Sequence, residues 1–136
     1  MSVLDTNVVS ELRKTPKGTA NPGVLAWADA VLTVGLFISA VTLMELGVLL
    51  EEKQDPAQGA VLRVWLDTPV RPAFAGRILP VDDLVAARCA ALHVARPRPA
   101  RDSLIAATAL AHGMTVVTRN VSDFQPCGVA LLNPWT

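Results

Sequence analysis

Cysteine is scarce in this 136-residue sequence, which contains only Cys89 and Cys127. The two residues form no Cys-x-x-Cys pair and no cluster with zinc-ligand spacing. A chain of this length can bury a core without disulfide bonds, so one domain spanning residues 1–136 is expected. The reducing cytoplasm is therefore the expected compartment.

The sequence has one long apolar stretch, AVLTVGLFISAVTLMELGVLL at residues 30–50, and Glu45 interrupts it. A membrane span requires roughly 20 apolar residues, and a central carboxylate is costly there. The uncharged part, residues 30–44, is too short, and its flanks are acidic. At the N-terminus, Asp5 ends the first apolar run before it reaches the length of a signal peptide. We therefore expect a buried strand followed by a buried helix, and no membrane association.

An excess of positive charge is also missing, since twelve Lys and Arg residues balance twelve Asp and Glu residues. A simple polycation that binds nucleic acid through its net charge is therefore disfavoured. Lysine is rare, and the last one in the chain is Lys53. There is no Gly-x-x-x-x-Gly-Lys-Ser/Thr loop, which argues against a nucleotide-binding switch.

Short apolar runs alternate with helical patterns along the chain, and 51% of the residues are hydrophobic. The expected strands are residues 2–4, 36–40, 78–81, 115–118 and 129–132, and the expected helices are residues 8–14, 22–32, 42–53, 57–67, 83–95 and 102–112. This alternation predicts an α/β fold: a parallel sheet of about five strands with helices on both faces. In such open sheets ligands bind beyond the carboxyl ends of the strands.

Acidic side chains fall at that edge of the predicted sheet. Asp5 follows the first strand, Glu45 lies in the helix after the second, Asp102 opens a helix, and Asp123 follows the strand at 115–118 together with Asn120. Taken singly, these residues could serve as helix caps, a buried ion pair or turn formers. Taken together, clustered carboxylates repel one another unless a cation binds. Oxygen ligands favour a hard divalent ion, and Mg²⁺ or Mn²⁺ fits best.

Carboxylate-bound Mg²⁺ at a sheet edge is typical of phosphoryl chemistry, in which the metal activates a water and neutralises charge on the phosphate. No nucleophilic side chain is needed. His93 and His112 are isolated in helical patterns, and no Ser-His-Asp arrangement is evident.

Four segments in order resemble PIN-domain proteins, and most closely the VapC/FitB type of ribonuclease toxin. They are LDTNVVSEL, ISAVTLMELGVLL, RDSLIAATALAHGMTVVTRNVSDF and the closing NPW, and FAGRILPVDD is similar to the connecting segment of that group. The resemblance covers nearly the whole chain. It implies a Mg²⁺-dependent endoribonuclease, for which Mn²⁺ can substitute, acting as the toxin of a type II toxin–antitoxin pair. It also implies a homodimer and a VapB/FitA-like antitoxin as partner.

The resemblance assigns roles by position. Asp5, Glu45 and Asp102 match the first three metal-binding acids, and either Asn120 or Asp123 occupies the fourth position. Thr118 matches a hydroxyl beside the metal, and Thr6 and Asn7 shape the loop that supports Asp5.

Basic residues near the acids have two interpretations. Arg96, Arg98 and Arg101 precede Asp102 in a proline-containing segment that is shorter than in relatives, and Arg119 follows the strand at 115–118. They either contact RNA phosphates or belong to a solvated surface. The three tryptophans are assigned to packing.

Two other functions compete with the nuclease. A signalling receiver or aspartyl-phosphate hydrolase also places acids around Mg²⁺, but each uses a lysine late in the chain, where Arg119 would be an unusual substitute. The second alternative is a catalytically weak or inactive PIN-fold module that acts through antitoxin and DNA binding. Retention of Asp5, Glu45 and Asp102 argues against it.

Overall fold

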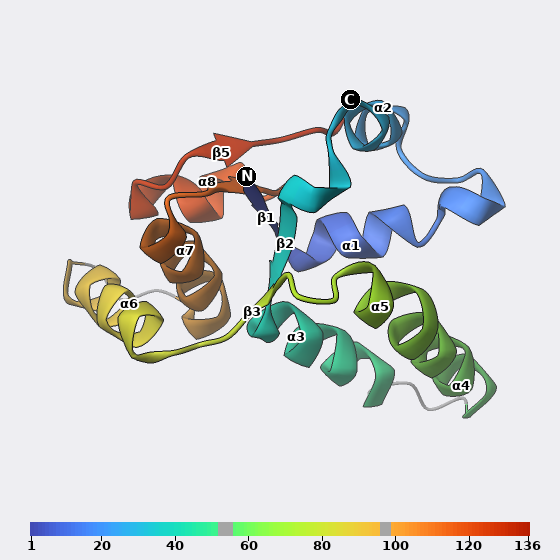
Figure 1. Cartoon of the computed structure of the whole chain (residues 1–136), viewed down its shortest axis with the longest axis horizontal. Coiled ribbons are helices and arrows are strands. Elements are labelled where there is room, and N and C mark those ends of the chain that lie inside the picture. The colour runs from blue at the N-terminus through green and yellow to red at the C-terminus, as the bar shows by residue number, and fades with distance from the viewer. Residues whose placement is uncertain (52–55, 96–98) are drawn as a thin grey trace.

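The computed structural model describes residues 1–51, 56–95 and 99–136. Five strands form one sheet (Figure 1): β1 Ser2–Leu4, β2 Leu36–Ser39, β3 Ile78–Leu79, β4 Thr115–Val117 and β5 Leu131–Leu132. The helices are α1 Thr6–Leu12, α2 Pro22–Ala30, α3 Ala40–Glu51, α4 Pro56–Trp65, α5 Arg71–Ala73, α6 Asp83–Ala95, α7 Ala100–His112 and α8 Val121–Phe124. Three short 3₁₀ turns, Thr15–Lys17, Thr33–Gly35 and Gln125–Cys127, and a π-helical segment, Leu66–Val70, connect them.

The sheet is parallel throughout, with the strand order β3-β2-β1-β4-β5. Val3 of the central strand β1 is in register with Phe37 on one side and Val116 on the other. The chain first builds the sheet outward through β2 and β3, and then returns to the other side of β1 with β4 and β5. The strand order therefore reverses between β1 and β4, which is where open α/β sheets bind ligands.

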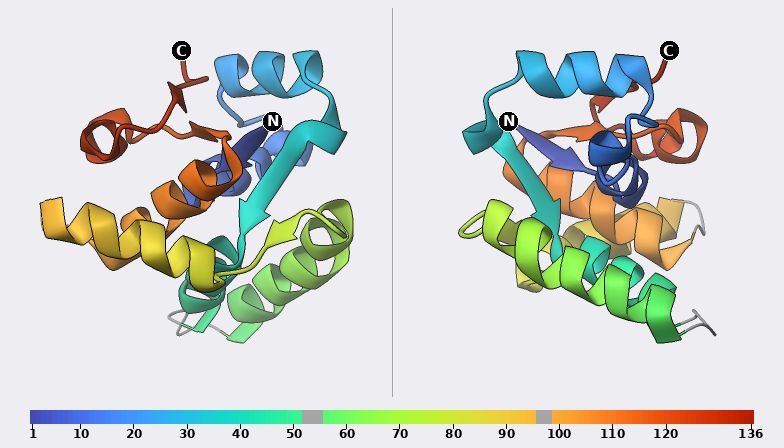
Figure 2. Two further views of the ribbon diagram at one scale, coloured as in Figure 1. Left: turned by 60° about the vertical axis from the view of Figure 1, so that its left-hand side comes forward. Right: turned by 90° about the vertical axis from the view of Figure 1, so that its right-hand side faces the viewer.

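Helices cover both faces of the sheet, as the two views in Figure 2 show. Successive strand residues point to opposite faces, so Val3 and Val116 pack with α7, whereas Leu4 and Val117 pack with α1 and α3. Both faces of the short strands are buried, which explains why they appear in the sequence as continuous apolar runs. The predicted fold class is confirmed.

Several element boundaries differ from the prediction. β2 passes directly into α3 at Ala40, and β3 ends at Leu79 because Pro80 has no N–H for a ladder. The predicted strand at 129–132 is shortened to β5, and the predicted helix at 8–14 starts earlier, at Thr6. Sequence reasoning missed α5 and α8, which are too short to show a period. The end of the predicted helix at 42–53 lies partly outside the described residues.

The apolar stretch at residues 30–50 folds as predicted, because it contains β2 and most of α3. None of the helices that the structure describes combines the length and apolar character needed to cross a membrane.

Candidate active site at the switch point of the sheet

A pocket of about 420 Å³ opens beyond the carboxyl ends of β1 and β4. Three of the predicted acids, Asp5, Glu45 and Asp102, line it together, although Asp5 follows β1 and the other two lie in α3 and α7. The other lining residues are Thr6, Asn7, Ser10, Glu11, Lys14, Arg119, Asn120 and Trp135. The sequence prediction that these three carboxylates meet at one edge of the sheet agrees with this arrangement.

Asp5 is held by three donors. The backbone N–H of Thr6 and the hydroxyl of Thr118 each donate to its carboxylate at 2.8 Å, and the Asn7 amide donates at 3.3 Å. The first of these bonds makes Asp5 the N-cap of α1. Only 4% of Asp5 is exposed. Capping and facing the pocket are therefore compatible roles of the same side chain.

Thr6 connects Asp5 to Glu45. Its backbone N–H bonds to Asp5, while its hydroxyl donates to Glu45 Oε1 at 2.8 Å and lies 3.4 Å from the hydroxyl of Thr42. One residue therefore fixes the positions of two carboxylates that are distant in the sequence. Glu45 is only partly buried, and its second carboxylate oxygen has no hydrogen bond within the described part of the chain.

Burial and mutual repulsion shape the titration of this cluster. Burial raises the pKa of Asp5 above 3.8, although its bonds to Thr118 and Thr6 lower it, and the charges of Glu45 and Asp123 raise it further. Burial also raises the pKa of Asp102, and the charges of Asp5 and Asp123 add to that effect. The negative charges of these acids therefore repel one another, and a bound cation would reduce that repulsion.

The β4–α8 loop supplies the fourth predicted position. Asn120 lines the pocket, and its backbone N–H donates to the Thr118 hydroxyl at 2.9 Å. Asp123 is exposed in α8 and does not line the pocket, although its charge raises the pKa of Asp5 and of Asp102. Of these two residues, Asn120 therefore belongs to the pocket wall, whereas Asp123 lies outside it and acts on the pocket through its charge.

Of the predicted basic contacts that the structure describes, only Arg119 lines the pocket. Arg101 is exposed in the first turn of α7 and is not part of the pocket wall. Arg96 and Arg98 lie outside the described residues.

The donor set fits a hard cation rather than a soft one. It consists of carboxylate and amide oxygens, and the described residues contain no histidine or cysteine in the pocket wall. Among those described residues, no three acidic, histidine or cysteine side chains are close enough to form a ready-made metal cage. Mg²⁺ suits such an open site, because it retains several waters and needs only one or two carboxylates.

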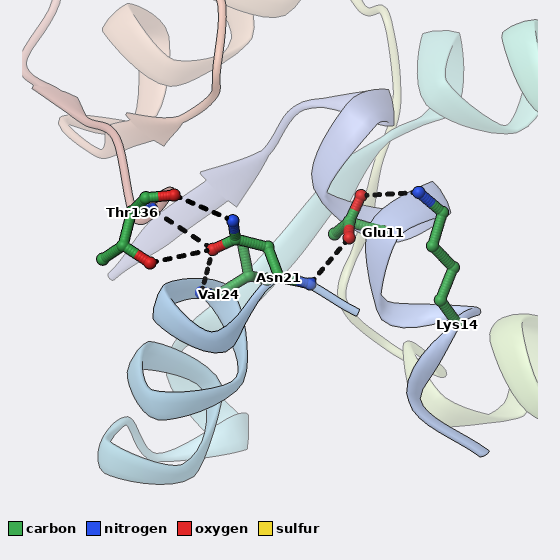
Figure 3. Close-up of polar contacts among 5 residues, drawn as sticks. All are labelled: Glu11, Lys14, Asn21, Val24 and Thr136. Carbon is green, nitrogen blue, oxygen red and sulfur yellow. Dashed lines mark hydrogen bonds and ion pairs between the residues drawn. The ribbon is translucent and has the colours of Figure 1, made fainter. Parts of the chain in front are cut away.

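Four wall residues were not identified from the sequence: Ser10, Glu11 and Lys14 of the α1 region, and Trp135 near the C-terminus. Figure 3 shows that Glu11 is satisfied within the protein, because it accepts bonds from the Asn21 N–H at 2.8 Å and from Lys14 at 3.1 Å. These contacts, the first above all, lower the pKa of Glu11 below 4.5. The Glu11–Lys14 spacing of three residues was the available sequence signal.

Comparisons with known proteins find similar proteins over nearly the whole chain. The family model described as PIN domain matches residues 2–125. The chain is 41% identical over 141 aligned residues to "VapC ribonuclease Y4jK" of Sinorhizobium fredii, with 99% of this chain and 98% of the relative covered. It is 40% identical to "Toxin FitB" of Neisseria gonorrhoeae, with 99% of each chain covered.

The fold is also similar to solved structures. The crystal structure of FitAcB from Neisseria gonorrhoeae contains a chain that matches with a TM-score of 0.89 at 37% identity, covering 99% of both chains. The backbone of this chain therefore follows that of the solved chain closely over nearly its whole length.

Proposed function

Because the chain belongs to the PIN-domain family, we propose that it is a metal-dependent endoribonuclease that acts as the toxin of a toxin–antitoxin pair. The names of two full-length relatives, a VapC ribonuclease and the toxin FitB, support the nuclease and toxin assignments. The observation that carries the proposal is the convergence of Asp5, Glu45 and Asp102 on one pocket.

No ion pair with Lys or Arg neutralises any of these three carboxylates within the described residues. Buried acids are normally paired or coordinate a metal, since an unpaired buried charge is costly. The pocket thus retains negative charge that the protein itself does not balance, and a divalent cation would balance it.

Asp5, Glu45 and Asp102 would hold Mg²⁺, with Asn120 as the fourth contact and Asp123 contributing charge. The ion, when bound, lowers the pKa of a coordinated water and neutralises charge on the phosphodiester. Thr118 and Asn7 keep the Asp5 carboxylate directed into the pocket, because they hold the same oxygen, Oδ2. Thr6 orients Glu45 through its hydroxyl. The chain itself needs no covalent nucleophile.

The test is RNA cleavage by the purified protein with Mg²⁺, with Mn²⁺ and with a chelator. Asp5→Asn keeps the shape of the side chain but removes its charge. We expect cleavage to fall by about 100-fold or more, because metal stabilisation supplies several kcal/mol to such reactions. Cleavage that survives both chelation and Asp5→Asn would exclude the proposed site. An absence of cleavage in the wild type, with the metal bound, would instead favour the inactive binding module.

The same proposal includes an antitoxin. One relative is named as a toxin, and this chain is similar to chains solved as FitAcB and as FitAB bound to a DNA fragment. We therefore expect a VapB/FitA-like chain to bind this protein. A homodimer remains a prediction from the family resemblance, and the mass of the isolated chain in solution tests it.

A further inference from the structure

Among the described residues, two basic side chains, Lys14 and Arg119, line the acidic pocket, and they differ in whether they form an ion pair. Lys14 is bound to Glu11 at 3.1 Å, so its charge is already used. Arg119 is exposed, and although its charge helps to lower the pKa of Glu11, it forms no ion pair with any carboxylate in the described ranges of the chain. Its guanidinium lies instead 5.7 Å from the ring centroid of Trp135, which also lines the pocket. Arg119 is therefore a cation at the rim with donors still available.

Trp135 holds Arg119 at that rim through a cation–π contact, which orients a guanidinium without consuming its hydrogen-bond donors. The backbone of Arg119 is fixed as well, because its N–H approaches the Asn7 side-chain oxygen at 3.4 Å. On the preceding residue, the N–H of Thr118 donates to the carbonyl of Leu132 at 2.9 Å, which joins the two segments that carry the pair. Both the backbone and the guanidinium of Arg119 are thus held in place.

The position of Trp135 depends in turn on a clasp, defined here as Asn21 and Gly23 holding residues 134–136. Asn21 accepts from the Thr136 N–H at 3.2 Å and donates to the Thr136 carbonyl at 3.1 Å (Figure 3). A Cβ at Gly23 would collide with the backbone oxygen of Pro134 and lie 2.9 Å from the Thr136 backbone nitrogen. Residues 134–136 can therefore pack against the start of α2 only if residue 21 forms hydrogen bonds and residue 23 has no side chain.

A polyanion that approaches an acidic pocket needs positive charge at the rim as well as at the acidic residues, because its own negative charge is otherwise repelled. Arginine suits this role, since its planar fork of donors matches two phosphate oxygens. We propose that Arg119, positioned by Trp135, binds an RNA phosphate that flanks the one held at the acidic cluster. This inference rests on the proposed nuclease function and names a phosphate-binding residue and a positioning residue for it.

The experiment measures binding of a fluorescein-labelled single-stranded uridine oligonucleotide by fluorescence anisotropy, with Mg²⁺ and in an Asp5→Asn background that does not cut the probe. Arg119→Ala should weaken binding on the order of tenfold, the effect of losing one charged hydrogen bond. It should also reduce the slope of log affinity against log salt by about 0.7, because one phosphate contact is lost. A purely structural role would leave that slope unchanged.

Trp135→Leu should weaken binding about two- to fivefold, whereas Trp135→Phe should restore it, since a phenyl ring keeps the cation–π contact. The matched control is Trp65→Leu, which removes a second pair, Arg13 over Trp65 at the same 5.7 Å, outside the acidic pocket. Binding should be unchanged in this control. Thermal unfolding of each variant verifies that it is folded.

The proposal is overturned if Arg119→Ala and Trp135→Leu bind the oligonucleotide as tightly as Trp65→Leu does. It is also overturned if Arg119→Ala leaves RNA binding unchanged but weakens an acidic protein partner. Failure of the nuclease function is separate, because it is seen as an absence of RNA cleavage by the metal-loaded wild type. The anisotropy series still measures the Arg119 contact in that case.

Discussion

Two carboxylates on the wall of the same pocket have opposite surroundings. Glu11 accepts bonds from the Asn21 N–H and from Lys14, and these donors lower its pKa. Asp102 lines the same pocket as Asp5 and forms no ion pair within the described residues, and burial and repulsion raise its pKa. The protein therefore provides hydrogen-bond donors and a cation for Glu11, whereas it provides no ion-pair partner for Asp102 within the described residues.

This difference separates a structural acid from a ligand-binding one without reference to any relative. An acid whose donors belong to its own chain stabilises the fold, and its removal leaves those donors unpaired. An acid that faces other acids destabilises the free protein and gains its partner only from outside. Substitution of each acid should therefore change the stability of the metal-free protein in opposite directions.

Glu11→Ala should have the larger effect on stability. It leaves the Asn21 N–H without its acceptor and Lys14 without its partner, so the free energy of unfolding should fall by about 1–3 kcal/mol. Asp67→Ala is the matched control, because it removes an exposed Asp67–Arg71 pair at 3.3 Å that should contribute less than about 0.5 kcal/mol. Urea unfolding measures both. Equal effects of the two substitutions would show that Glu11 is an ordinary surface acid.

Asp102→Asn should have a smaller effect of opposite sign on the metal-free protein. Removing a charge that is partly buried and repelled should raise the free energy of unfolding by up to about 1 kcal/mol at neutral pH. Cleavage should be lost in the same variant. A variant that is both destabilised and active would contradict the assignment of Asp102 to the unbalanced side of the comparison.

The pH dependence of stability should sharpen the contrast. Because the pKa values of Asp5 and Asp102 are raised from 3.8, the folded state binds more protons, and the aspartates' contribution to stability falls as the pH rises above that value. The pKa of Glu11 is lowered from 4.5, so its contribution is present above 4.5 and is lost as the pH falls through the lowered value.

Urea unfolding of the metal-free protein across this range provides the measurement. Asp102→Asn should lessen the loss of stability on raising the pH, and Glu11→Ala should lessen the loss on acidification. Identical pH profiles in the two variants would remove the electrostatic distinction between these acids.

The main features of this arrangement were predictable from the sequence. Continuous apolar runs indicated buried parallel strands, and Asp5 stands directly after the first of them. Glu45 was the most informative residue, because an acid among apolar neighbours has no solvated face. These signals are local. Because ligands of open parallel sheets bind beyond the carboxyl ends of the strands, the residues that carry these signals could be assigned to one edge.

The remaining wall of the pocket was not predictable in the same way. Trp135 reaches the pocket only because Asn21 and Gly23 receive the C-terminal segment, and no local pattern reports that contact. The choice between Asn120 and Asp123 depends on how α8 turns after β4, which a four-residue helix does not reveal by periodicity. Long-range docking and short-element geometry were therefore the missing information.

Calorimetric titration with Mn²⁺ tests whether Asp5, Glu45 and Asp102 bind a divalent cation and whether Glu11 takes no part in that binding. We expect the wild type and Glu11→Gln to bind Mn²⁺, and Asp5→Asn to lose at least about tenfold in affinity. Absence of Mn²⁺ binding by the folded wild type, or equal binding by Asp5→Asn, would show that these acids are not a cation site.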